Sequence, residues 1–281
     1  FNTRRKPFED IRVRRALITL FDFAVINTSL YHGLYARTES AFERSELSSS
    51  GRPADAHERR LLAPFIDRVK PEILAGTYRQ PISDGSGHDR ASLRAALRLL
   101  KDAGYTVKQS VLVETATGKP FAFEILAQTR EQERLFLSFA DGLKRAGIAV
   151  SIRQVDSAQY QDRLTHFDFD MIQYNWPSSL SPGNEQTFRW GTAEASKDGS
   201  FNFAGVREPA VDAMIAALLA AKDKDEFQSS VRALDRVLMS GDYVIPLFHL
   251  KNVWVAHSAK LKRPEKGPLS GYQLDTWWMG E

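Results

Sequence analysis

The sequence predicts an α/β fold with a mixed sheet flanked by helices. Helix-like and strand-like segments alternate through the middle of the chain, and such alternation is typical of layered α/β domains. Helices are expected at 131–146 and 156–164, and strands at 148–155 and 169–174. A length of 281 residues suits one or two domains of this kind.

Helices are predicted where apolar residues recur every three or four positions behind a capping residue. The clearest case is 91–103, where Leu93, Leu97 and Leu100 share one face and Asp89 precedes them. The full set, in chain order, is 11–23, 25–31, 54–68 (interrupted by Pro64), 91–103, 131–146, 156–164, 210–221 and 224–240.

Strands are predicted where polar and apolar residues alternate between turn residues. The segments 111–113 and 121–126 are expected to form a hairpin across the turn 117–120. Further strands are expected at 1–3, 148–155, 169–174, 244–248 and 253–255, and long loops at 36–51 and 71–90. The strands at 244–255 would expose an edge, so we expect them to pair with another copy or to turn inward.

Composition excludes several classes of protein. The formal net charge is only +3 and acidic residues are dispersed among basic ones, which does not favour nucleic-acid binding. The absence of cysteine excludes disulfides and thiolate metal sites. No apolar run approaches the roughly 20 residues of a membrane helix. The chain starts at Phe1 without a leader-like segment, so we expect that a signal peptide has been lost from this sequence.

Catalytic motifs are weak. Asp168 and Asp170 share a strand face and could form a carboxylate pair, but capping of the strand is the simpler interpretation. The six histidines lack metal-ligand spacing, so no metal or cofactor is expected. Serine-hydrolase and nucleotide-binding motifs are also missing.

The segment 175–202 is the strongest candidate for a ligand site. It follows a buried strand, so it starts at the edge of the sheet where ligands bind in open α/β folds. It combines aromatic platforms with neutral hydrogen-bonding groups, which hold a ligand without transforming it. The expected ligand-binding residues are Tyr174, Asn175, Trp176, Ser178, Ser179, Asn184, Glu185, Gln186, Trp190 and Asn202. A purely structural loop, locked by its own aromatic residues, is the alternative.

The run N-T-R-R-K-P-F-E-D-I-R-V-R-R-A-L at 2–17 resembles the signature of the family 5 extracellular solute-binding proteins of ABC importers. The segment S-L-S-P-G-N-E-Q at 179–186 and D-T-W-W at 275–278 are similar to the Yej-type, peptide-binding branch of that family. In this family the signature lies midway along the mature protein. The resemblance therefore implies that the chain is the C-terminal half.

The resemblance implies one lobe of a two-lobed periplasmic-binding-protein fold. Residues 1–249 would form the second ligand-binding lobe, and 250–281 would return to the absent first lobe, with hinges near 1–3 and 248–250. It further implies a periplasmic, non-enzymatic protein of Gram-negative bacteria, exported by a signal peptide. Such a protein captures peptides or peptide-like compounds and delivers them to ABC permease subunits with their ATPase. The alternatives are an α/β hydrolase using Asp168 or Glu185, and a ligand sensor of the same fold.

One departure from the family affects ligand recognition. Peptide binders of the family often carry G-W-x-x-D-Y-x-x-P, whose aspartate pairs with the α-amino group of the peptide. Here Trp176 and Pro182 remain, and Ser179 stands most simply at the place of the aspartate. The resemblance therefore leaves recognition of a free amine open, with Glu185 as a possible substitute.

Overall fold

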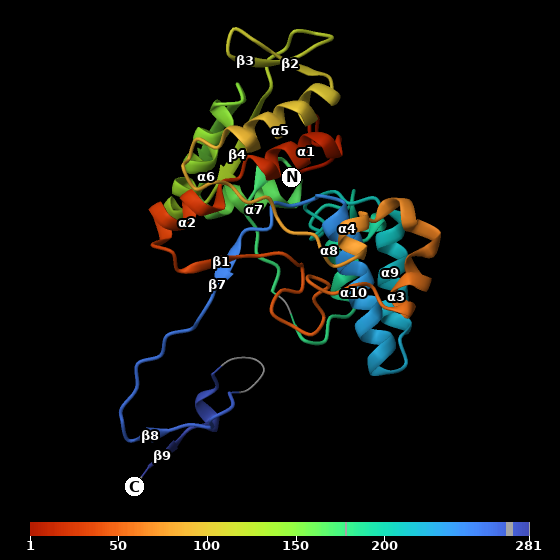
Figure 1. The fold of residues 1–281 in the computed structure, drawn as a ribbon, viewed down its shortest axis with the longest axis vertical. Helices are drawn as coiled ribbons and strands as arrows, with labels where there is room; N and C mark the ends of the chain where they lie inside the picture. Colours follow the sequence, from red (N-terminus) through yellow and green to blue (C-terminus); the bar gives the residue numbers. More distant parts are fainter. Residues whose placement is uncertain (178, 268–271, 281) are drawn as a thin grey trace.

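The computed structural model describes residues 1–177, 179–267 and 272–280. Two bodies lie side by side, and a C-terminal segment extends away from both (Figure 1). The α/β body contains α1 (Ile11–Thr19), α2 (Phe23–Tyr31), α5 (Arg90–Asp102), β2 (Tyr105–Lys108), β3 (Val111–Glu114), β4 (Ala122–Ala127), α6 (Arg130–Lys144), β5 (Ala149–Gln154), α7 (Ser157–Thr165) and β6 (Met171–Ile172). The helical body contains α3 (Ala56–Leu62), a 3-10 helix (Ala63–Arg68), α4 (Pro71–Leu74), α8 (Glu185–Trp190), a second 3-10 helix (Thr192–Glu194), α9 (Pro209–Ala220) and α10 (Lys224–Ser240).

The chain leaves the bodies through a short antiparallel ribbon of β1 (Tyr35–Arg37) and β7 (Phe248–Leu250). Phe248 of this ribbon packs against Phe23 and Tyr31 of α2, with ring centroids 5.9 and 5.0 Å away. The C-terminal segment follows, and carries β8 (Leu261–Lys262), a 3-10 helix (Leu274–Thr276) and β9 (Trp278–Met279).

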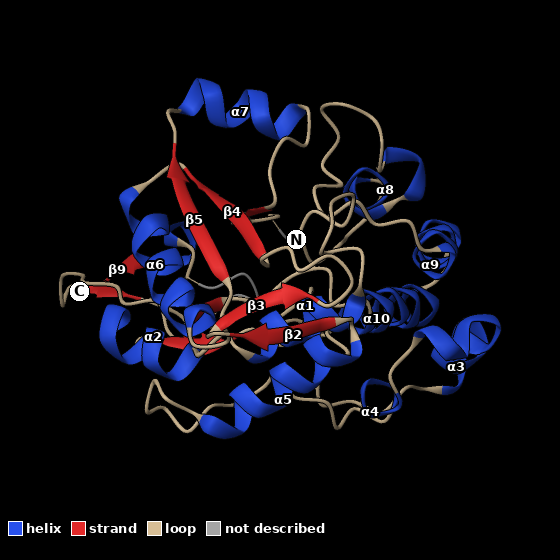
Figure 2. Ribbon diagram, turned by 90° about the horizontal axis from the view of Figure 1, so that it is seen from above, coloured by secondary structure: helices blue, strands red, loops and turns tan. Residues whose placement is uncertain are grey.

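A three-stranded parallel sheet in the order β5-β4-β6 forms the centre of the α/β body. Alternate side chains of β4 face opposite sides: Phe123 and Ile125 pack with α6, whereas Leu126 packs with residues of α7. Figure 2 shows β4 and β5 lying between these two helices. The parallel layout follows from the two helical crossovers, β4-α6-β5 and β5-α7-β6.

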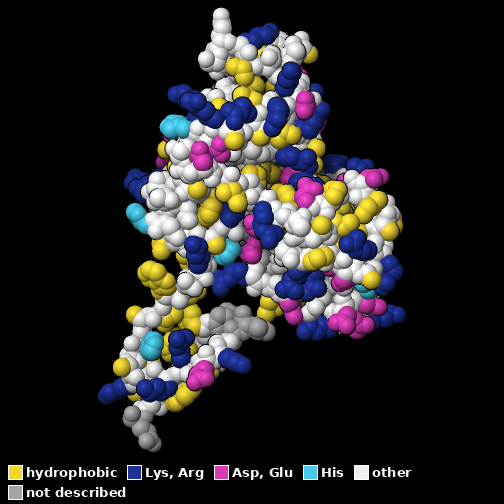
Figure 3. Space-filling view, in the orientation of Figure 1, with side chains coloured by type: hydrophobic (Ala, Val, Ile, Leu, Met, Phe, Trp, Pro, Cys, Tyr) yellow, Lys and Arg dark blue, Asp and Glu magenta, His cyan; other side chains and the backbone are white. Residues whose placement is uncertain are grey.

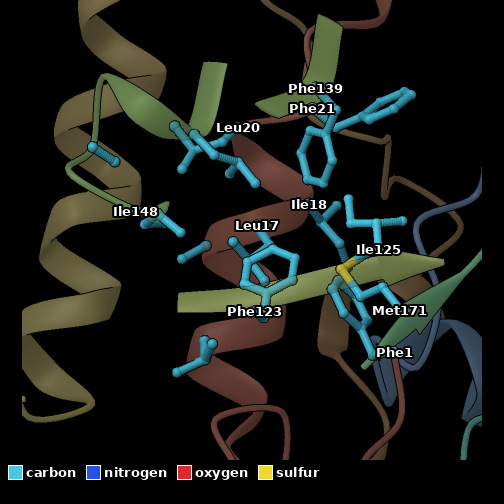
Figure 4. Packing of buried hydrophobic residues seen from close by; sticks show 14 of the residues in the cluster. Phe1, Leu17, Ile18, Leu20, Phe21, Phe123, Ile125, Phe139, Ile148 and Met171 are labelled. Atoms are coloured by element: carbon cyan, nitrogen blue, oxygen red, sulfur yellow. The ribbon is translucent and has the colours of Figure 1, made fainter. Parts of the chain in front are cut away.

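The main core of this body lies where α1 and α6 cover the sheet. Leu17 and Ile18 of α1 are buried against Phe123 and Ile125 of β4 and against Phe139 of α6 (Figure 4). The amphipathic patterns of the sequence thus produce one continuous apolar layer, which the hydrophobic effect stabilises.

An N-terminal strap, residues 2–5, joins segments that are distant in sequence. The Asn2 side chain donates to the carbonyls of Phe167 and Phe169, at 3.0 and 2.8 Å, and its backbone amide donates to Asp170. Thr3 donates from both its amide and its hydroxyl to the carbonyl of Ala204. The strap therefore holds the start of β6 beside the loop that leads to α9.

Arg4 extends the strap. Its guanidinium donates to the carbonyls of Ala195, Asn202 and Phe203 and lies 3.8 Å from the centroid of the Phe167 ring. These carbonyls belong to irregular backbone, where no helix or strand supplies a donor, and a buried carbonyl without a donor is costly.

Arg14 performs the same task at the junction of the two bodies. It is 5% exposed and donates to the carbonyls of Phe8, Glu9, Gly241 and Asp242. The first two carbonyls precede α1 and the last two follow α10. A single side chain on α1 therefore fixes the end of the longest helix of the helical body.

Two adjacent residues of α10, Asp235 and Arg236, are fully buried in the helical body. Arg236 donates to Glu58 of α3 at 2.5 Å and also to the carbonyls of Arg52 and Ile73. Asp235, fully buried, accepts from the hydroxyls of Ser40 and Ser49 and from the amides of Ala41 and Ser49. Burial raises the pKa of both Glu58 and Asp235 despite these bonds.

The predicted hairpin forms only beside its turn at 117–120. There the amide of Phe121 donates to the carbonyl of Leu112 at 2.8 Å, and Val113 forms an isolated antiparallel bridge with Pro120. The main partner of 111–114 is β2, and β4 lies in the parallel sheet. Gln109 and Ser110, both with positive φ, form a two-residue turn of the kind that joins adjacent strands. Glutamine and serine are not typical of such a turn, whereas the residue types of Thr117-Gly118-Lys119-Pro120 are typical of turns.

Other predictions differ in extent. The expected strand 169–174 is only Met171–Ile172, and the expected loop 71–90 includes α4. The 1–3 segment bonds to loops and belongs to no strand of the described residues. The strand expected at 244–248 lies at Phe248–Leu250, and 253–255 is irregular. Because β7 pairs with β1, it turns inward; pairing with another copy stays a prediction.

Replacing Arg236 by methionine should destabilise the fold strongly, because it leaves the Glu58 carboxylate buried without a counter-ion. We expect the free energy of unfolding to fall by about 3–5 kcal/mol, measured by urea denaturation of this chain. Arg232→Met is the control. It lies on the same helix and donates from the surface to the carbonyl of Glu46, so its loss should stay below about 1 kcal/mol. Equal losses for both variants would contradict the assignment.

Candidate functional site

The candidate site begins where the chain leaves the sheet. After Ile172, residues 173–176 run from the carboxyl end of β6 towards α8 in the helical body. Because the strands of the sheet are parallel, their carboxyl ends meet at this edge, which is the usual ligand-binding edge of open α/β folds.

Aromatic rings cluster along this path. Trp176 lies 4.7 Å from Trp190 and 5.2 Å from Tyr174, and Tyr174 lies 4.5 Å from Phe203, between ring centroids. The indole nitrogen of Trp176 donates to the carbonyl of Phe201 at 3.4 Å. Trp176 remains partly exposed, so one side of the cluster is fixed by packing while another can contact a ligand.

A cavity of about 550 Å³ lies beside this cluster. Its wall is shared by the two bodies and the ribbon: Phe21, Ile125 and Phe139 come from the α/β body, Leu238 and Met239 from α10, and residues 244–249 from the chain leading into and through β7. The volume lies within the range of about 300–1,000 Å³ for small-molecule sites. Apolar side chains dominate its lining, with a few polar groups among them.

The structure brings six of the ten expected residues to this cavity. The residues that line it are Tyr174, Asn175, Trp176, Ser179, Gln186 and Trp190. Ser178 lies outside the described residues.

The structure places Asn184, Glu185 and Asn202 off the cavity wall. Asn202 is fully buried: its amide donates to the carbonyls of Gly191 and Val206 and its oxygen accepts from the amide of Val206. Glu185 folds onto its own loop and accepts from the amide of Gly183 at 2.9–3.0 Å. Against the raising effect of burial, this bond lowers the pKa of Glu185.

Sequence reasoning missed cavity residues outside the 175–202 loop. Thr38, Ser40 and Phe42 belong to a segment expected to be a plain loop, and His249 belongs to β7. The Thr38 hydroxyl lies 3.2 Å from Nδ1 of His249, which links two neighbouring parts of the ribbon. Burial lowers the pKa of His249, which favours the neutral form of its ring. No periodicity in the sequence signals that these segments converge.

The carboxylate pair has a structural role. Arg5 donates to Asp168 at 2.6 Å and to Asp170 at 3.1 Å, and Asp170 also accepts from the amide of Glu124. The hydrogen bond from Arg5 lowers the pKa of Asp168. Neither aspartate lines the cavity. Within the described ranges, no three or more His, Asp or Glu side chains gather as a metal-ligand set, and no helix there is long and apolar enough to span a bilayer.

Known proteins are similar to this chain over nearly all of its length. A family model described as bacterial extracellular solute-binding proteins, family 5 middle, matches residues 1–198. A Brucella melitensis protein named as a binding protein is 55% identical over 278 residues, which are 99% of this chain and 45% of that protein. The peptidoglycan-binding protein YepA of Agrobacterium fabrum is 44% identical, over 99% of this chain and 45% of YepA. The chain spans about half the length of the curated relatives it matches.

Solved structures share the fold. AppA, an oligopeptide-binding protein of Bacillus subtilis bound to a nonapeptide, matches with a TM-score of 0.68 at 17% identity, over 100% of this chain and 50% of AppA. The periplasmic murein tripeptide binding protein MppA, in an unliganded open form, matches with a TM-score of 0.62 at 19% identity, over 99% of this chain and 46% of MppA. These likenesses confirm the predicted α/β fold of one lobe.

Asn202→Ala should act on stability, because its amide serves backbone groups of the loop and none of the cavity. Removing it leaves the amide and the carbonyl of Val206 without these partners, and takes from the carbonyl of Gly191 one of its two donors. We expect the free energy of unfolding to fall by about 1–3 kcal/mol in urea denaturation. A variant that unfolds like the original chain would contradict this role.

Proposed function

The chain belongs to the bacterial extracellular solute-binding proteins of family 5, as its opening signature predicted, and from that premise we propose that it is one lobe of a protein that captures peptides or peptide-like compounds. The observation that carries this proposal is the cavity at the carboxyl edge of the sheet, with its aromatic cluster and neutral polar groups. Relatives and fold neighbours named for peptide, oligopeptide or peptidoglycan binding support the ligand class.

We further propose the arrangement of the whole protein. Residues 1–249 form the second lobe and 250–281 return to a first lobe, with hinges near 1–3 and 248–250. Support comes from the C-terminal segment, which projects away from both bodies and carries many apolar side chains (Figures 1 and 3). Trp254 is 81% exposed, Leu274 66% and Met279 66%. A first lobe would cover this surface and remove it from water.

The protein would work in the periplasm of a Gram-negative cell, where a signal peptide would deliver it. It would pass its ligand to the permease subunits of an ABC transporter with their ATPase. The family description as extracellular solute-binding proteins supports this location, and so does the periplasmic neighbour MppA. Hinge closure of two lobes over the ligand is the physical step that would couple capture to delivery.

We propose that the protein binds its ligand without transforming it chemically. Asp168 and Glu185, the candidate catalytic groups of a hydrolase, are held by Arg5 and by the loop at Gly183, away from the cavity wall. Mass spectrometry of ligands after incubation with the protein should find them unchanged. A cleaved product would revive the hydrolase alternative.

The protein extended to the full length of its relatives should bind members of a panel of short peptides in calorimetric titration. Trp176→Ala should weaken that binding severalfold or more, because it removes the more exposed of the two indole rings that line the cavity. Phe188→Ala is the matched control, since Phe188 is 42% exposed on the same segment and lies off the cavity wall. If no peptide of the panel binds, the peptide proposal is refuted. If the Trp176→Ala variant binds as tightly as the unaltered protein, this loop is not part of the site.

In the extended protein, Trp254 should be covered by the first lobe. Its fluorescence, obtained as the difference between the protein and its Trp254→Phe variant, should shift to shorter wavelength and resist acrylamide quenching compared with this chain alone. Equal quenching of Trp254 in both proteins would argue against return of the segment to a first lobe.

A further inference from the structure

The cavity wall has an unequal charge. Among its described lining residues there is no aspartate or glutamate, whereas Arg189 brings a permanent positive charge to it. His249 also lines the cavity, but its partly buried ring is bonded to Thr38. A ligand ammonium would therefore find no counter-ion on this wall, and a ligand anion would find one.

Neither Ser179 nor Glu185 supplies a counter-ion for an amine. Ser179 lines the cavity, and its hydroxyl accepts from the amide of Ser181. The Glu185 carboxylate is held by the amide of Gly183 and the side chain of Gln186. A serine hydroxyl can hydrogen-bond a ligand but carries no charge.

Arg189 is available for a partner. It lies between Phe188 and Trp190 on α8, is partly buried, and donates from Nη2 to the carbonyl of Pro177 at 2.8 Å. It makes no direct ion pair in the part of the chain that the structure describes; at longer range its charge acts on Glu185, one turn away on α8, and helps to lower the pKa of that carboxylate. This sets it apart from Arg5 and Arg236, whose carboxylate partners lie within 3.1 Å and 2.5 Å. Nε and Nη1 remain as donors for a second group.

We propose that Arg189 binds an anionic group of the ligand, a carboxylate in the case of a peptide, and that this lobe reads the acidic end of its ligand and not an amine. The inference rests on the proposed function and names the charge that this wall selects. A guanidinium beside a largely apolar, aromatic wall suits this task, because partial desolvation strengthens its hydrogen bonds to a carboxylate and its planar fork offers two parallel donors.

The test uses the protein extended to the full length of its relatives and a library of short peptides made of alanine, serine, leucine and phenylalanine. Each peptide is supplied in four forms, with the amino end free or acetylated and the carboxyl end free or amidated. Retained peptides are quantified by native mass spectrometry under competition. We expect the free-carboxylate forms to be preferred over the amides by at least about tenfold. We expect acetylation to change binding by less than about twofold.

Arg189→Gln should abolish the preference for the free carboxylate, while its amide can still donate to Pro177. Arg189→Lys keeps the charge without the fork and should retain part of the preference, which separates loss of charge from loss of folding. Arg153→Gln, on the exposed side of β5 and off the cavity wall, is the matched control and should keep the full preference.

Equal binding of acids and amides by the unaltered protein would overturn this inference and leave the peptide proposal standing. A preference that survives in Arg189→Gln would likewise overturn it. Failure of all four peptide forms to bind would overturn both.

Discussion

Two arginine side chains hold backbone carbonyls that no helix or sheet can satisfy, and the relative position of the two bodies depends on them. Arg4 gathers the carbonyls of 195, 202 and 203, and Arg14 gathers those that flank α1 and α10. Each guanidinium offers five donors in a fixed plane, which suits several converging carbonyls. Lysine could supply the charge but not this geometry. Arg4 and Arg14 both belong to the signature that identifies the family, so in this structure the signature residues have a structural role.

The position of the cavity depends on the hydrogen bonds made by the strap and by Arg14. The strap holds the start of β6, from which Tyr174 and Trp176 follow, and Arg14 holds the end of α10, which contributes Leu238 and Met239 to the wall. Asp235 adds a third constraint, because its carboxylate binds Ser40 and Ser49 and so fixes the loop that lies beside the site. A wall made from distant segments can be well defined only if each segment is anchored in this way.

Local patterns predicted much of the fold. The helices at 91–103, 131–146 and 224–240 appear within one or two residues of expectation, because amphipathic spacing and capping residues determine them locally. The predicted hairpin across 117–120 forms only beside its turn, and the pairing of 111–114 with β2 was missed because the turn that joins them, Gln109-Ser110, adopts positive φ without glycine or asparagine. The strand at 169–174 was shortened because Asn2 takes the carbonyls just before β6, a contact across more than 160 residues.

The candidate site was predicted only in part, because local patterns in the sequence do not reveal contacts between distant segments. Aromatic residues in a non-periodic loop pointed to Tyr174, Trp176 and Trp190, which do line the cavity. The roles of Asn202 and Glu185 were not foreseeable, since a polar side chain that serves its own backbone looks in sequence like one that serves a ligand. Thr38 and His249 reach the cavity only through the pairing of β1 with β7, which no local signal announces.

The strap also has a consequence for how the lobe acquires its shape during synthesis. Asn2 and Arg4 are synthesised before their partners at 167–169 and 195–203, which follow 165 to 199 residues later. At roughly 5–20 residues per second, the strap waits about ten seconds or more for its carbonyls. Closing such distant contacts is slow, so the two bodies can acquire local structure well before they are locked together. The order of translation thus makes joining of the bodies a late event in folding.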